Sequence, residues 1–299
     1  MKKGIAVILA FVMLICVSAC AGRESGASQS LGAGSASVDT QPADGKVSIT
    51  VGLSNNITAL DPISASDIYS ANVYGCIYET LMREEENGEV VPNLCESVDI
   101  SEDGLTYTFH LPQGVKFHNG ESVTAEDVIY SIKRCADNEG SAIDSSLVSA
   151  FSVISDVQAT DDKTVVLTLK QPDLELLNFL TAAIVPANYD KLDTEPCGTG
   201  PFKFSSRSVK ENFVIEKFDE YWGTPASLSK VTFQVYDDST ALVNALQSGA
   251  VDLCSKLTSA QTAQLSDSYT ILEGTMNLVQ AVYLNNNAAP FDNEKVRQA

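Results

Sequence analysis

The chain has 299 residues, with 19 Lys and Arg against 39 Asp and Glu, which gives a formal net charge of -20 at pH 7. Such an acidic chain is repelled by phosphate backbones, so we expect no nucleic-acid partner. Hydrophobic residues make up 44% of the chain and charged residues 19%, which is typical of packed globular domains rather than of disordered or fibrous chains. At roughly 100 to 200 residues per domain, this length favours two domains.

The amino terminus has the region order of a secretion signal. Two lysines precede an uncharged apolar run over residues 5–17, which is shorter than the ~20 apolar residues that a membrane span requires. The letters VSAC at residues 17–20 resemble a bacterial lipobox, in which Cys20 receives a diacylglyceryl group and becomes the first mature residue. We therefore predict a lipoprotein signal peptide over residues 1–19. The alternative is ordinary signal cleavage beside a chance cysteine.

A tether is predicted directly after the signal. Residues 20–45 are rich in Gly, Ser and Ala and show no apolar periodicity, which indicates a flexible segment. The mature body would be too acidic to adsorb to an anionic leaflet, so the lipid on Cys20 would be its attachment to the membrane. The predicted location is the extracytoplasmic face of the cell membrane.

Five cysteines follow the lipobox. Their odd number, their irregular spacing and the lack of a C-x-x-C pair in the sequence argue against a metal or redox site, so we expect buried free thiols. They are Cys76, Cys95, Cys135, Cys197 and Cys254.

The first half of the body mixes helices with hairpin strands. Residues 47–53 predict a strand, and apolar positions at helical spacing predict a helix from Val73 to Leu81. Period-two alternation over residues 105–111 predicts a half-buried strand that places His110 on its solvent face.

A helix is predicted to start at Thr124, because Thr124 and Asp127 have the spacing of a capping box before an apolar stripe. After a strand over residues 165–169, Asp173 is predicted to cap a short helix through Leu180.

The second half contains a hairpin and then a strand, a helix and a strand. The helix is predicted from Ser239 to Ser248, and Gly249 stops it, so the unit is a βαβ crossover. Residues 270–274 and 279–285 read as extended segments. Asp292 is then predicted to cap a helix that has only begun at residue 299, which suggests a fragment or a truncated protein.

Catalytic signatures are scarce in the sequence. It has no G-x-S-x-G, H-E-x-x-H, Walker A or complete G-x-G-x-x-G motif, and two histidines leave few candidates for a general base. Residues 198–201 precede a strand rather than a helix, so we interpret them as a tight structural turn and not as a phosphate loop. His118 lies in a polar turn beside Glu121 and Glu126, where a metal site is the less favoured interpretation. We expect no enzyme activity and no cofactor.

Four stretches carry more specific patterns. They are YTFHLPQGVKFHNGESVTAEDVIYSIKR (107–134), CGTGPFKF (197–204) with EYWG (220–223), ALQSGAVDL (245–253) and YLNNNAAPFDNEKVRQA (283–299). In this order and behind a lipobox, they resemble the family 5 extracellular solute-binding proteins of ABC importers, the peptide- and nickel-binding group.

The resemblance implies a mixed α/β and α+β fold of the periplasmic-binding-protein type (type II, cluster C), with two lobes around a ligand cleft. Residues 46–70 and 187–288 would form lobe I, and residues 71–186 a subdomain inserted in it. Residues 289–299 would begin a second lobe that is almost entirely missing. The first strand and the later βαβ unit would share one sheet. Because one lobe cannot enclose a ligand, residues 1–299 alone would not be expected to bind tightly.

The resemblance also places the cleft beside two segments of lobe I, the loop after the first strand and the strand before the crossing to the other lobe. A loop beside a strand edge can hold an extended peptide by main-chain hydrogen bonds. An ordinary surface loop and sheet are the alternative interpretation. The candidate ligand-binding residues are Ser66, Asp67, Ile68, Tyr69, Asn277, Gln280, Tyr283 and Asn285.

The predicted function is that of a monomeric, membrane-anchored receptor that captures oligopeptides or a related small solute and delivers them to an ABC transporter permease. Nickel chelates, haem and sugars are alternatives within the same fold. A secreted lipoprotein hydrolase is the main alternative from another class, and an adhesive or structural lipoprotein is a third. The sequence lacks a recognisable nucleophile with its base, and it lacks repeats, which argues against both.

Overall fold

The computed structural model describes residues 47–64, 67–85, 87–136, 145–173, 175–265, 268–274 and 284–298. The chain divides into two compact units, Met1–Tyr269 and Thr270–Ala299, and each is described by itself. Within the described residues, no helix is long and apolar enough to cross a bilayer.

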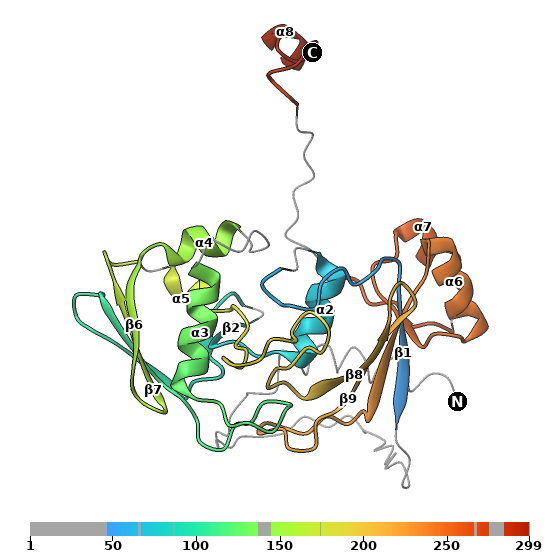
Figure 1. Cartoon of the computed structure of the whole chain (residues 1–299). Coiled ribbons are helices and arrows are strands. Elements are labelled where there is room, and N and C mark those ends of the chain that lie inside the picture. The colour runs from blue at the N-terminus through green and yellow to red at the C-terminus, as the bar shows by residue number, and fades with distance from the viewer. Residues whose placement is uncertain are drawn as a thin grey trace, which may run out of the picture. The chain divides into compact units, whose positions relative to one another are not determined.

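A five-stranded mixed sheet is the first main element of Met1–Tyr269 (Figure 1). Its first strand lies in the middle of three parallel strands, and the other two are joined by helix α6 (Ser239–Ser248). This arrangement confirms both the predicted βαβ crossover and its shared sheet with the first strand. In sheet order the strands are β11 (Leu253–Cys254), β1 (Ser48–Leu53), β10 (Lys230–Val235), β9 (Asn212–Lys217) and β8 (Phe202–Ser208).

The ends of α6 follow from two residues. The Asp238 carboxylate accepts the amide of Ala241 at 2.8 Å, which satisfies one of the free amides of the first turn. Gly249 adopts a φ of 77° after the last turn, a left-handed conformation that glycine takes without steric cost. The predicted stop at Gly249 is confirmed.

A four-stranded antiparallel sheet lies in the middle of the chain. Helix α3 (Ala125–Ala136) packs against its strands β6 and β7. In sheet order the strands are β4 (Ser97–Ile100), β5 (Thr106–His110), β7 (Thr164–Leu169) and β6 (Ile154–Asp161). The smaller elements nearby are β2 (Met82–Glu84), β3 (Val90–Pro92), α4 (Ser145–Phe151) and α5 (Leu176–Phe179). The strands predicted over residues 105–111 and 165–169 are confirmed as β5 and β7. The helix predicted to start at Thr124 is confirmed as α3.

Each sheet has its own hydrophobic core. Phe109 and Phe117 are fully buried in the core of the four-stranded sheet. Phe202 and Phe213 lie in the core of the five-stranded sheet, together with the buried face of α2 (Ile68–Ile77). Burying a side chain of this size contributes about 1.5–3 kcal/mol. The lobe and subdomain boundaries proposed from the sequence remain predictions.

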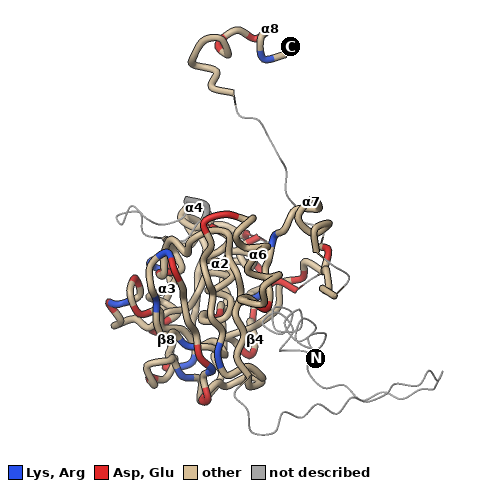
Figure 2. The backbone as a smooth tube through the Cα atoms, turned by 90° about the vertical axis from the view of Figure 1, so that its right-hand side faces the viewer, with Lys and Arg blue, Asp and Glu red and all other residues tan. Residues whose placement is uncertain are grey.

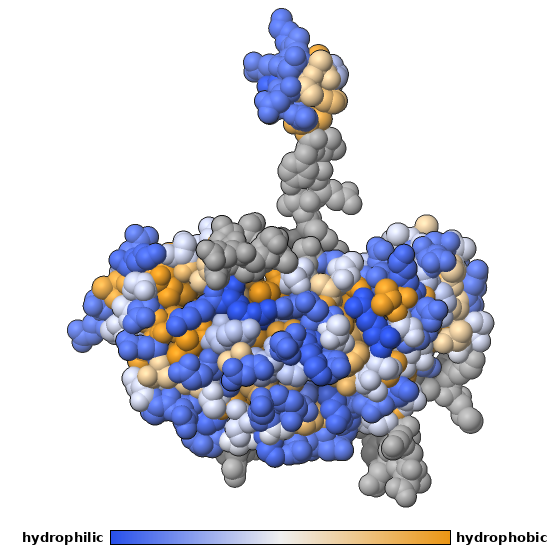
Figure 3. All heavy atoms as spheres, in the orientation of Figure 1, coloured by the Kyte–Doolittle hydropathy of each residue, from blue (hydrophilic) through white to orange (hydrophobic). Residues whose placement is uncertain are grey.

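The surface of the first unit is mostly polar. Figure 2 shows Asp and Glu residues at many places along the backbone of this unit, in keeping with the net charge of -20. On the face drawn in Figure 3, apolar residues form patches that hydrophilic residues interrupt.

Three predicted helix starts are wrong. Helix α2 begins at Ile68 instead of Val73, because Asp67 caps it, and it ends at Ile77. The Asp173 carboxylate accepts the amide of Glu175 at 2.9 Å in a local turn, so it does not cap α5.

The third correction lies in Thr270–Ala299. Helix α8 (Glu294–Gln298) is capped by Asn293, whose side chain accepts the amide of Lys295 at 3.0 Å, instead of by Asp292. Residues 270–274 form no strand, and most of the segment 279–285 lies outside the described residues.

Candidate functional site

The three parallel strands end at the same edge of the five-stranded sheet. Strands β1, β10 and β11 run in one direction, so the segments that follow them leave the sheet side by side. Ligands of open α/β sheets bind outside this edge. We call residues 54–58, 236–238 and 255–257, which follow these strands, the carboxyl edge.

Asp67 fastens helix α2 to the carboxyl edge. Its carboxylate accepts the amides of Tyr69 at 3.0 Å and Ser70 at 2.9 Å, and the hydroxyls of Ser70 at 2.6 Å and Thr58 at 2.5 Å. Partial burial alone would raise the pKa of Asp67, but these hydrogen bonds outweigh it and lower the pKa. Asp67 therefore stays ionised and serves to position the start of α2.

Tyr69 brings together residues from three parts of the chain. Its hydroxyl lies 2.8 Å from Oγ of Ser54, which follows β1. The ammonium group of Lys256, which follows β11, lies 5.9 Å from the centre of the Tyr69 ring, within cation–π distance. Ile68 precedes Tyr69 and is 45% exposed. Both residues lie in the first turn of α2 and not in the predicted loop.

The other predicted contacts have different outcomes. Asn285 belongs to Thr270–Ala299, where its side chain accepts the amide of Asn287 at 3.0 Å. The structure thus brings together Asp67, Ile68 and Tyr69 of the predicted set. Cys20, Ser66, Asn277, Gln280 and Tyr283 lie outside the described residues.

Sequence reasoning missed Ser54 and Lys256. The available signal was their place within two residues of the ends of two parallel strands of one sheet. Polar residues at that position are the ones that an open α/β sheet presents to a ligand.

Glu79 joins two of the motifs singled out in the sequence. Its buried carboxylate accepts hydrogen bonds from Nε1 of Trp222 at 2.7 Å, Oγ1 of Thr199 at 2.8 Å and the hydroxyl of Tyr221 at 2.9 Å. Burial raises the pKa of Glu79 although the three donors oppose the shift. The carboxylate has no basic partner in these contacts, and its role is to hold the two motifs together.

The turn at residues 198–201 lies against the end of α2. The amide of Gly200 donates to the carbonyl of Ile77 at 2.9 Å. A Cβ atom on Gly198 would lie 2.2 Å from that carbonyl oxygen, so a larger residue has no room there. This geometry confirms a structural turn rather than a phosphate loop.

His118 lies in the predicted polar turn, and its ring packs against the turn at residues 198–200. Its Nε2 lies 2.9 Å from the carbonyl of Gly200, and its Nδ1 accepts the amide of Gly198 at 3.3 Å. Its ring meets that of Phe218 edge-on at 4.9 Å. Burial lowers the pKa of His118 to about 4. With both ring nitrogens occupied, His118 has no free lone pair for a metal ion.

The other histidine and the acidic residues give no metal centre either. His110 is 40% exposed, as predicted, and its Nε2 lies 2.9 Å from a carboxylate oxygen of Asp99. Within the described residues, no group of three His, Cys, Asp or Glu side chains could hold a metal ion.

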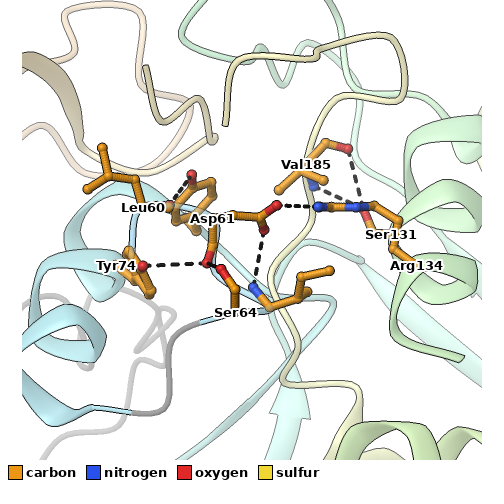
Figure 4. Close-up of polar contacts among 9 residues, drawn as sticks. Leu60, Asp61, Ser64, Tyr74, Ser131, Arg134 and Val185 are labelled. Carbon is orange, nitrogen blue, oxygen red and sulfur yellow. Dashed lines mark hydrogen bonds and ion pairs between the residues drawn. The ribbon is translucent and has the colours of Figure 1, made fainter. Parts of the chain in front are cut away.

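A second polar network ties the loop after β1 to α3 (Figure 4). Arg134 forms an ion pair with Asp61, and their side chains are 19% and 12% exposed. The Asp61 carbonyl accepts the amide of Ser64 at 3.1 Å and the hydroxyl of Tyr74 at 3.4 Å. Ser131, one turn earlier on α3, accepts the amide of Val185 at 2.9 Å. These contacts fix the loop that leads to Asp67 against the four-stranded sheet unit.

The five cysteines of the body are free thiols. Cys95, Cys135 and Cys197 are buried free thiols, as predicted, whereas Cys254 is only partly buried. Burial raises the pKa of all four to about 11, so they are protonated at neutral pH. Cys76 is also partly buried, and its thiol donates to the carbonyl of Asn72 at 3.7 Å.

The comparisons with known proteins agree with this architecture. The family model of the bacterial extracellular solute-binding proteins, family 5, matches residues 89–299. The chain therefore belongs to this family. Its solved relatives are periplasmic binding proteins, so the predicted type II two-lobe fold class is confirmed.

Three proteins that are similar to this chain have a solute in their name or in their solved structure. The glutathione-binding protein GsiB of Pectobacterium atrosepticum is 31% identical over 261 residues, which cover 83% of this chain and 50% of GsiB. The ABC transporter-associated periplasmic binding protein DppA of Helicobacter pylori, in complex with the peptide STSA, is 30% identical with a TM-score of 0.66 and coverage of 73% and 48%. AgaA of A. tumefaciens R10, in complex with agropinic acid, is 34% identical with a TM-score of 0.62 and coverage of 68% and 43%.

The chain spans about half the length of the curated relatives it matches. GsiB is named for the solute it binds and DppA is named as a periplasmic binding protein, so neither name states a reaction.

Proposed function

We propose that this protein is an extracytoplasmic receptor that binds a short peptide or a peptide-like solute and delivers it to the permease of an ABC transporter. The observation that carries the proposal is the 31% identity with a glutathione-binding protein over 83% of this chain. Glutathione and STSA, the ligand of DppA, are both short peptides. No chemical change of the solute is part of the proposal.

The carboxyl edge and the first turn of α2 together offer the groups that such a solute needs. Ile68 is an exposed apolar side chain, and Tyr69 and Lys256 supply an aromatic face and a cation beside it. Solute sites combine apolar and aromatic surface with a few placed polar groups. Ser66, Asn277, Gln280, Tyr283 and Asn285 remain proposed contacts from the family resemblance.

A hydrolase is the less favoured function because neither histidine contacts a nucleophile among the described residues. His118 is held by two backbone groups. His110 contacts the Asp99 carboxylate, and no Ser, Thr or Cys side chain is hydrogen-bonded to its ring in the part of the chain that the structure describes.

Attachment by lipid is a separate part of the proposal. The VSAC motif supports acylation of Cys20, and residues 20–45 have the composition of a tether. Cys20→Ser should abolish incorporation of a labelled fatty acid and move the protein from the membrane fraction to the medium. Unchanged labelling of the Cys20→Ser variant would contradict the anchor without touching the solute proposal.

The receptor proposal is tested by a thermal-shift and calorimetry screen of the natural protein at its full length. The probes are glutathione, STSA, a nickel–histidine complex, haem and a sugar. Saturable stabilisation by a peptide is expected, and a ligand at 100 times its Kd should add about 2.7 kcal/mol. Binding of a chelate, haem or a sugar alone would overturn the peptide class. Turnover of an ester or a peptide would overturn the receptor proposal.

A further inference from the structure

Lys256 has a backbone conformation that lysine rarely adopts. In the described part of the chain, two residues other than glycine have a positive φ, Lys210 at 65° and Lys256 at 63°. This conformation is sterically unfavourable for an L-residue. Lys210 lies in the three-residue turn between β8 and β9, where hairpin geometry calls for a left-handed residue. Lys256 lies between β11 and α7 (Ser259–Thr262), outside any hairpin. Strain of this kind tends to persist where it serves a function.

The Lys256 side chain is an available cation. It is exposed, and it forms no ion pair with the described residues. Its ammonium group lies over the Tyr69 ring. Asp67, two residues before Tyr69, already accepts four hydrogen bonds from protein donors, so its carboxylate is committed elsewhere.

Three residues with hydroxyl groups lie next to Lys256 in space or in sequence. Tyr69 and Ser54 share one hydrogen bond, in which a single proton is used, so the pair retains a second hydroxyl proton for a ligand. Ser255 precedes Lys256, and its buried hydroxyl has no hydrogen-bond partner among the described residues. A buried hydroxyl without a partner is destabilising. The carboxyl edge and the first turn of α2 therefore bring the Lys256 ammonium group together with hydroxyl groups from three chain segments.

We propose that Lys256, with Tyr69 and Ser54 beside it, binds a carboxylate group of the solute. This inference rests on the proposed receptor function and adds to it the chemical class of the solute. A carboxylate would accept charge-assisted hydrogen bonds from the ammonium group and from a hydroxyl. In a chain with a net charge of -20, an anionic solute needs such a local cation. Glutathione, STSA and agropinic acid, the ligands of three relatives, all carry a carboxylate.

The test is calorimetry of the natural protein at its full length with two matched pairs of probes. These are STSA against its carboxyl-terminal amide, and glutathione against its diethyl ester. Lys256→Met should weaken binding of the acid form by about 10- to 100-fold, because a hydrogen bond to a charged group is lost. Lys256→Arg should retain most of the affinity. The Lys256→Met variant should no longer distinguish the acid from the amide or ester.

Two further variants separate recognition from general effects. Lys230→Met removes the same charge from an exposed lysine at the other end of β10, and its affinity should equal that of the wild type. Lys256→Gly relieves the backbone strain, so it should raise the melting temperature of the unliganded protein and still lose affinity. That combination excludes misfolding as the cause of weak binding.

The failures of the two proposals differ. If the wild type binds a probe and Lys256→Met binds it equally well, the carboxylate inference is overturned and the receptor function stands. If Lys230→Met loses as much affinity as Lys256→Met, the effect is one of net charge and the inference is again overturned. If the wild type binds neither STSA nor glutathione, the inference fails together with the peptide-receptor proposal.

Discussion

The indole nitrogen of Trp222 donates a 2.7 Å hydrogen bond to the carboxylate of Glu79, 143 residues earlier in the chain. Thr199 and Tyr221 donate to the same carboxylate. Two of the motifs that carry the family resemblance, residues 197–204 and 220–223, therefore meet at one buried acid. In the structure these contacts hold the loops after α2 and β9 in place. Because the bonded residues are 120 to 143 positions apart in the sequence, no local pattern could predict the contacts.

Glu79→Gln should lower the free energy of unfolding by about 1–3 kcal/mol, because an amide nitrogen would face one of the three donors. Trp222→Phe removes one donor, and the double variant should lose less than the sum of the two single losses. Urea unfolding of the four proteins measures this coupling. Additive losses would contradict the shared site.

The Glu79 contribution should also depend on pH. Because burial raises its pKa above the ordinary 4.5, the native state holds the proton more tightly than the unfolded state. The stability that this provides is fully present below pH 4.5 and is lost as pH rises through the folded-state pKa. The stability advantage of wild type over Glu79→Gln should therefore shrink as pH rises above 4.5. A difference that stays constant with pH would contradict the raised pKa.

His118 should make the protein sensitive to acid. Its pKa falls from 6.5 to about 4 on burial, so the unfolded state takes up the proton first, and stability is lost as pH falls from 6.5 towards 4. The full loss is roughly 3 kcal/mol at 1.36 kcal/mol per pKa unit. His118→Gln should remove this part of the pH profile, whereas His110→Gln should leave it. Equal profiles for wild type and His118→Gln would contradict the assignment.

Gly198→Ala should destabilise the fold, because its Cβ would meet the Ile77 carbonyl at 2.2 Å. Overpacking of this kind costs about 1–3 kcal/mol. Gly75→Ala is the matched control: it lies within α2, has no atom within 4 Å of the added Cβ, and should gain about 0.5–1 kcal/mol from helix propensity. Thermal unfolding should thus move in opposite directions, and a stable Gly198→Ala variant would contradict the close approach.

Arg134→Met should cost about 3 kcal/mol, because it leaves the largely buried Asp61 carboxylate without its cation. The Lys116–Glu220 pair is the control. Its side chains are 41% and 59% exposed, so Lys116→Met should cost under about 1 kcal/mol. Denaturant midpoints measure both losses. Equal losses would show that the buried pair has no special role in fixing the loop.

Local signals explain which parts of the fold could be predicted from the sequence. The α6 crossover has a stop at Gly249 and apolar strands on both sides, and the α3 start has the spacing of Thr124 and Asp127. All of these lie within a few residues of the element they define. The start of α2 had such a signal too, in the capping residue Asp67. The apolar spacing after Val73 was used instead, so the predicted start of α2 was five residues too far along the chain.

The candidate site depends on contacts that no local pattern reports. The proximity of Ser54, Tyr69 and Lys256 depends on the order of the strands in the sheet, and 187 residues separate the last two. His118 seemed polar from its neighbours, yet its ring is held by backbone groups 80 and 82 residues away. The family resemblance supplied Tyr69 as a candidate, and the sheet topology supplied its companions.

Hydrogen–deuterium exchange of the natural protein at its full length, with and without a saturating bound peptide, tests the location of the solute most directly. The amides of residues 54–58, 68–70 and 254–257 should become protected, while those of residues 215–217 and 229–231 at the opposite edge of the sheet stay unchanged. Protection confined to the opposite edge, or saturating binding without protection at the carboxyl edge, would contradict the site described for this receptor.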